Sequence, residues 1–105
     1  MSTMYNKIMA LPKYPFVKQD LSILIYDRIN YVEVEKIVLE TNLEILIDII
    51  PFEVYKDESI PQDKKVLGLE LTFQKNDATL TKDEIEKAMN IVKNALKEEV
   101  GAEIR

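Results

Sequence analysis

Residues 65–74 have the sequence KVLGLELTFQ, in which large apolar side chains occupy every second position. On an extended chain these large side chains fall on one face, and the other residues fall on the opposite face. The first set is Leu67, Leu69, Leu71 and Phe73, and the second is Val66, Gly68, Glu70, Thr72 and Gln74. A period of two predicts a β-strand with one face in a hydrophobic core.

Downstream of this strand, the residues around position 81 predict the start of a helix. Thr81 and Glu84 have the spacing of a capping box, and Leu80 and Ile85 can pack against each other around it. Apolar residues at helical spacing continue to Leu96, and Gly101 is a typical stop signal. We therefore expect a helix over 81–100 and a short final strand over 102–105.

Upstream, residues 45–55 are rich in β-branched and aromatic residues and predict a strand that forms a long hairpin with 65–74. Pro51 predicts a bulge or an edge position for this strand, because proline donates no ladder hydrogen bond. Before it, Asn30 is a suitable N-cap for a helix over 30–41. The alternation of Leu21, Ile23 and Ile25 predicts a first strand over 20–26.

The resulting order, β-α-β-β-α-β, predicts an α+β, ferredoxin-like split fold. This fold has a four-stranded antiparallel sheet with both helices on one face. The length of 105 residues fits one domain over 1–105, in which 1–11 form an N-terminal extension. The second face of the sheet is left uncovered.

Composition excludes several function classes. The chain contains no histidine and no cysteine, which removes the usual general base, thiolate nucleophiles and zinc sites built on these residues. We therefore expect no active site and no bound cofactor or metal in these residues. The formal net charge of −5 argues against tight RNA binding by the domain alone. No apolar run is long enough for a membrane span and no signal peptide is evident, so we expect a cytoplasmic protein.

A few residues have more than one interpretation. Tyr26 shares a strand face with Ser22 and Leu24, where its ring could stack on a nucleobase or simply pack as a half-exposed side chain. The basic pairs Lys13 with Lys18, and Lys64 with Lys65, could contact phosphate or only solvate the surface. The paired carboxylates at 57–58, 83–84 and 98–99 fit solvated surface better than an acid–base pair.

An ordered series of short motifs resembles a known family. The motifs are Lys13-Tyr14-Pro15, Gln19-Asp20-Leu21-Ser22, Phe52-Glu53-Val54-Tyr55, Ile60-Pro61, Lys64-Lys65, Leu71-Thr72-Phe73, Leu80-Thr81-Lys82-Asp83-Glu84 and Gly101-Ala102-Glu103-Ile104-Arg105. With these spacings, residues 11–105 resemble the ferredoxin-fold anticodon-binding domain that closes the beta chain of phenylalanyl-tRNA synthetase.

The resemblance implies a tRNA-binding domain that contacts the anticodon region through the open sheet face during aminoacylation. By matching strand positions, it implies that the following residues line the RNA side: Ser22, Leu24, Tyr26, Val66, Gly68 and Glu70. Lys13 and Lys18 would be the phosphate partners. The implied partners are tRNA, the synthetase alpha chain and the remaining beta-chain domains. Catalysis with ATP and magnesium would belong to the alpha chain of the parent phenylalanine-tRNA ligase.

The sequence departs from this family at positions that bear on RNA contact. The family commonly has arginine at Gln19, serine at Val66 and a basic residue at Glu70, and it has glycine at Asp57 and Asp63. These differences and the acidic balance leave a second interpretation open. According to this second interpretation, the chain is a non-catalytic protein-interaction or regulatory module of the same fold that has lost RNA contact.

Overall fold

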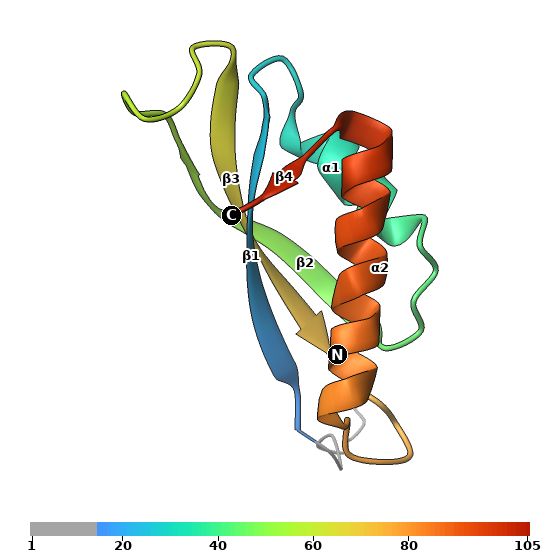
Figure 1. The fold of residues 1–105 in the computed structure, drawn as a ribbon. Coiled ribbons are helices and arrows are strands. Elements are labelled where there is room, and N and C mark those ends of the chain that lie inside the picture. The colour runs from blue at the N-terminus through green and yellow to red at the C-terminus, as the bar shows by residue number, and fades with distance from the viewer. Residues whose placement is uncertain (1–14) are drawn as a thin grey trace, which may run out of the picture.

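The computed structural model describes residues 15–105, which form one four-stranded antiparallel sheet with two helices on one face (Figure 1). The elements are β1 (Val17–Tyr26), α1 (Tyr31–Leu39), β2 (Leu46–Tyr55), β3 (Lys64–Phe73), α2 (Lys82–Val100) and β4 (Glu103–Ile104). The sheet order is β2-β3-β1-β4, so each helix connects two strands that are not neighbours. The predicted β-α-β-β-α-β ferredoxin-like fold is confirmed.

The two central strands, β1 and β3, pair over their whole length, from Val17 opposite Phe73 to Tyr26 opposite Lys64. This explains why β1 begins at Val17 and not at the predicted Asp20, since β3 supplies pairing partners as far as Phe73. The alternating apolar side chains of both strands are buried beneath the helices: Leu21, Ile23, Ile25, Leu67, Leu69, Leu71 and Phe73. The period of two therefore separates a core face from an open face.

Both helices begin at the predicted caps. The Asn30 side chain accepts a hydrogen bond from the Glu33 amide at 3.1 Å. At α2 the Thr81 hydroxyl accepts from the Glu84 amide, and the Glu84 carboxylate accepts in return from the Thr81 amide. These bonds satisfy amides that lack partners inside the helix. Gly101 ends α2 in a left-handed conformation, with φ of 67°.

The outer edge of β2 is protected by side chains. The Ile49 amide donates to the Asp48 carboxylate at 3.0 Å, and the Ile49 carbonyl accepts from the Tyr31 hydroxyl at 3.1 Å. Pro51 has no amide to donate, and the strand is irregular between Leu46 and Asp48 and between Pro51 and Glu53. The prediction of a bulge or an edge position at Pro51 is confirmed, because β2 is an edge strand and its register shifts next to Pro51. These features close much of this edge to pairing with another strand.

Burial changes the acidity of Tyr31 at this edge. Burial, together with the nearby Glu35 carboxylate, raises the pKa of the Tyr31 hydroxyl from 10.0 to about 12. The hydroxyl therefore stays protonated near neutral pH and remains a donor, with the Ile49 carbonyl at 3.1 Å and the Glu35 carboxylate at 3.2 Å as its two acceptors. In the part of the chain that the structure describes, neither helix is both long and apolar enough to cross a membrane.

Candidate nucleic-acid interface

The sheet face opposite the helices, called the open face below, is organised by strand register into rows. Residues directly opposite each other on paired strands point to the same face. One row joins Tyr26 to Lys64, and the next joins Leu24 to Val66 and Tyr55. The following rows pair Ser22 with Gly68 and Asp20 with Glu70. The register therefore brings the six strand residues that the resemblance indicated onto one surface.

Two of these six residues are not accessible. Val66 is only 1% exposed, and Gly68 is buried. The Phe52 ring covers Gly68 so closely that a β-carbon added there would lie 2.8 Å from Phe52 Cζ. The expectation that Val66 and Gly68 lie uncovered is wrong. Gly68 is covered by the Phe52 ring, where the edge strand is irregular between Pro51 and Glu53, and Val66 lies between Leu24 and Tyr55 of the neighbouring strands.

The open face carries aromatic rings that the sequence reasoning missed. Tyr26 was the one stacking residue expected among the strand candidates, yet Phe52 is 51% exposed and Tyr55 is 37% exposed. Tyr55 lies directly opposite Val66, so a hairpin register would have placed it on this face. Phe52 lies on this face because of the bulge after Pro51, and Pro51 is the one residue in the sequence that indicated this bulge.

Tyr26 lies at one end of the open face, beneath two positive charges. The Arg28 guanidinium carbon and the Lys64 amino nitrogen are each 5.1 Å from the centre of its ring. Both distances are within the range of cation–π contacts. Tyr26 is 38% exposed, so part of the ring remains accessible.

Lys64 is held in place by a second contact. Its amino group lies 3.0 Å from the Glu103 carboxylate of β4. The hydrogen bond to Glu103 raises the pKa of Lys64, so the ammonium charge over Tyr26 is secure at neutral pH. Below, the Tyr26 end of the open face means Tyr26, Arg28 and Lys64.

The opposite part of the open face is acidic and partly apolar. Glu70 lies between Asp20 on β1 and Ile50 on β2, and Asp48 belongs to the next row. Lys18 forms an ion pair with Glu70 at 3.7 Å, so its charge is already opposed by a carboxylate. Below, the Glu70 end means Lys18, Asp20, Asp48, Ile50 and Glu70. Lys13, the other expected phosphate partner, lies outside the described residues.

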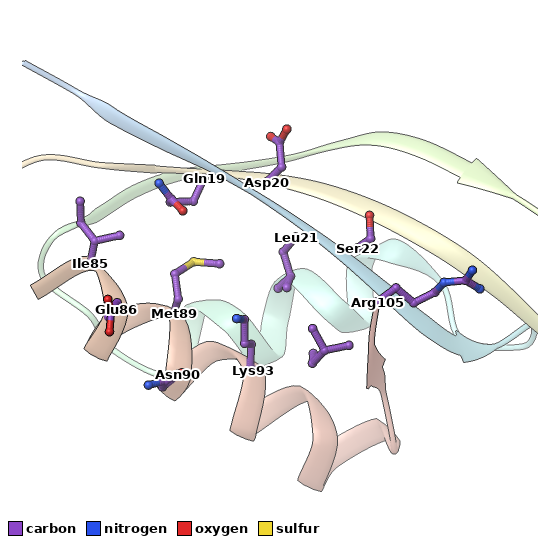
Figure 2. Close-up of a pocket in the computed structure, with 11 residues that line it drawn as sticks. Gln19, Asp20, Leu21, Ser22, Ile85, Glu86, Met89, Asn90, Lys93 and Arg105 are labelled. Carbon is purple, nitrogen blue, oxygen red and sulfur yellow. The ribbon is translucent and has the colours of Figure 1, made fainter. Parts of the chain in front are cut away.

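Gln19 does not belong to the open face. It pairs with Leu71, whose side chain is in the core. Figure 2 shows Gln19 pointing toward the helix layer, in a hollow that Met89 and Lys93 also line, whereas the side chains of Asp20 and Ser22, at the border of this hollow, point away from the helix layer. The missing positive charge at Gln19 therefore concerns the helix side of the sheet and not the open face, and its effect on RNA contact stays a prediction.

The open face offers chemistry for binding. Partly exposed rings can stack on planar groups, and guanidinium and ammonium groups can hold phosphate. Among residues 15–105, no group of three or more acidic side chains is arranged to hold a metal ion. The surface is thus suited to contact a ligand that combines flat rings with negative charge.

Comparison with known proteins agrees with this geometry. The sequence profile of the ferredoxin-fold anticodon binding domain matches residues 12–105. The phenylalanine–tRNA ligase beta subunit of Clostridium acetobutylicum is 37% identical over 100 residues, which cover 95% of this chain and 13% of that protein. The beta subunits of Listeria monocytogenes, 34% identical over 95 residues, and Clostridium tetani, 33% identical over 100 residues, are also similar.

These alignments cover 90% and 95% of this chain but only 12% and 13% of the two subunits, so the chain spans about an eighth of the length of its relatives. The match nevertheless includes every helix and strand described above. The chain belongs to the family of ferredoxin-fold anticodon-binding domains.

Proposed function

We propose that this chain binds the anticodon region of a tRNA through its open face, as the anticodon-binding part of a phenylalanine–tRNA ligase beta subunit. The observation that carries the proposal is the partly exposed Tyr26 ring beside Arg28 and Lys64, on the sheet face that the helices leave free. Family membership and the beta-subunit relatives support the choice of RNA as the ligand.

In this proposal the chain contributes recognition and no chemistry. Aminoacylation with phenylalanine, ATP and magnesium would take place on the alpha chain, with other beta-chain domains contributing further contacts to the tRNA. The working location would be the cytoplasm, where tRNA is charged for protein synthesis. The net charge of −5 is compatible with this role, because the whole enzyme shares the task of holding the RNA.

The isolated chain should bind weakly. We expect a dissociation constant for a phenylalanine-tRNA anticodon stem-loop no better than about 10⁻⁴–10⁻⁶ M, with strong dependence on salt. The Glu70 end repels phosphate, and Lys18 is already paired there, which limits the number of productive contacts. Binding should therefore be measured at low salt.

The test is chemical-shift mapping of the labelled chain during titration with the stem-loop. The proposal predicts shifts in β1 and β3 at the Tyr26 end, with little change on the exposed surfaces of α1 and α2. An RNA hairpin with the same stem and an altered loop serves as the control for loop recognition. Shifts confined to the outer helix surfaces would show that the proposed RNA site is wrong.

A second function is favoured by a different observation. At the Glu70 end, Ile50 is 44% exposed directly beside Glu70, with Asp20 on the far side of Glu70, and the half-exposed Phe52 lies nearby on the same strand. An exposed apolar group with an acidic border is typical of a protein contact with a basic, apolar partner. If RNA causes no shifts on the open face, a protein-interaction or regulatory module becomes the better interpretation.

A further inference from the structure

The turn after β1 is fixed by contacts to the loop between β2 and β3 and to the start of β3. The Asp27 amide donates to the Asp63 carbonyl at 2.8 Å, and the Asp27 carbonyl accepts from Lys65 Nζ at 3.0 Å. Lys56 lies 3.5 Å from the Asp27 carboxylate. Asp27 therefore uses its amide, carbonyl and carboxylate to join the two segments, which fixes the backbone from which Arg28 projects.

Arg28 differs from the other positive side chains at this end. Lys56 and Lys64 each lie within ion-pair distance of a carboxylate, namely those of Asp27 and Glu103. Arg28 has no such partner among residues 15–105, and its guanidinium lies over the Tyr26 ring. Its full positive charge is exposed and held beside an aromatic ring.

A hollow borders this pair. Tyr26, Asp27, Arg28 and Asp63 line it, so it lies where the β1–α1 turn meets the β2–β3 loop. A guanidinium presents a planar fork of donors that matches two phosphate oxygens, and a tyrosine ring presents a flat surface for a base. The two groups are adjacent, as are the base and the phosphate of one nucleotide.

We propose that Tyr26 and Arg28 form a single-nucleotide subsite, in which the ring stacks on an unpaired base and the guanidinium binds the adjoining phosphate. This rests on the proposed function, and it deepens it by giving Arg28 a role that neither the resemblance nor the family comparison assigns. Lys64 acts as a support, because its ion pair with Glu103 keeps it at the ring. On binding, the Arg28 guanidinium turns from the ring to the phosphate, and the base takes its place.

The experiment measures stem-loop affinity as a function of salt for wild type, Arg28→Ala and Lys87→Ala. Lys87 is exposed on α2, in the helix layer, so its removal changes the net charge equally without touching the open face. Each phosphate contact to single-stranded RNA contributes about 0.7 to the slope of log K against log salt. Arg28→Ala should lower the magnitude of the slope by about 0.7, and Lys87→Ala should leave it unchanged. Tyr26 ring protons in Arg28→Ala should still shift on RNA binding.

The outcomes separate the inference from the function on which it rests. Wild-type binding with equal slopes for wild type and Arg28→Ala would overturn the subsite and leave the proposed function standing. Equal loss of slope in Arg28→Ala and Lys87→Ala would reduce the role of Arg28 to net charge and would also overturn it. No shifts on the open face of wild type would remove the proposed function, and the subsite with it.

Discussion

The two ends of the open face belong to the same strands but present opposite chemistry. At the Tyr26 end, two positive side chains lie over an aromatic ring, and one of them has no acidic partner in the described part of the chain. At the Glu70 end, the exposed apolar residue Ile50 lies beside Glu70, with Asp20 in the same row and Asp48 in the next, and Lys18 is paired with Glu70. The difference teaches that a net charge of −5 does not describe the local charge at either end of the open face, because positive and negative side chains lie in different rows of the sheet.

The largest expected effect comes from reversing charge at each end. Lys64→Glu removes a positive charge from the Tyr26 ring and places a carboxylate near Glu103, so RNA binding should fall, most strongly at low salt. Glu70→Lys removes a charge that repels phosphate and frees Lys18, so binding should tighten. Titration of each variant with the stem-loop at several salt concentrations measures both. Equal responses at the two ends would contradict the comparison.

A smaller effect, on stability and not on binding, is expected at the β2 edge that supports the Glu70 end. Tyr31→Phe leaves the Ile49 carbonyl without its donor, which should lower the free energy of unfolding by about 1 kcal/mol. Since the folded chain raises the pKa of Tyr31 to about 12, its stabilising contribution is present below pH 10 and is lost as pH rises from 10 to 12.

Urea unfolding of wild type and Tyr31→Phe across this pH range gives the free energy of unfolding of each protein. The difference between the two at each pH is the contribution of the Tyr31 hydroxyl, because the lysines titrate equally in both proteins. The two stabilities should converge as the pH approaches 12. Affinity of Tyr31→Phe for the stem-loop at neutral pH should equal that of wild type. If the difference in the free energy of unfolding between wild type and Tyr31→Phe does not change with pH, the stabilisation does not depend on the hydroxyl proton of Tyr31.

The smallest effect is expected at Gly68, between the two ends. The new methyl group of Gly68→Ala would lie 2.8 Å from Phe52 Cζ, but that atom is the far end of a half-exposed side chain that can turn away. We expect the free energy of unfolding to change by no more than about 1 kcal/mol. The Phe52 ring protons should move in the NMR spectrum. A loss of several kcal/mol would mean that the ring is locked over β3.

Most of the fold could be predicted because local signals agreed with the global pattern. The alternation in 65–74, the capping box at Thr81 and the N-cap at Asn30 each acted through neighbours in sequence. The start of β1 at Val17 was missed because Val17, Lys18 and Gln19 become strand only through pairing with β3.

The open face was harder to predict because it depends on register and irregularity. Ser22, Leu24, Tyr26 and Glu70 could be placed by alternation along their own strands. Phe52 covers Gly68 because of a bulge in a different strand, β2, and Pro51 is the one residue in the sequence that indicated this bulge. The position of Arg28 over Tyr26 depends on how the turn after β1 is held by the β2–β3 loop, which no local pattern encodes.

The most direct test of the central claim compares two uncharged truncations, Tyr26→Ala and Ile50→Ala, in stem-loop binding at low salt. Both residues lie on the open face, one at each end, and neither change alters net charge. If RNA stacks at the Tyr26 end, Tyr26→Ala weakens binding by about 1–3 kcal/mol, and Ile50→Ala leaves it unchanged. Loss of binding with Ile50→Ala and none with Tyr26→Ala would contradict the account.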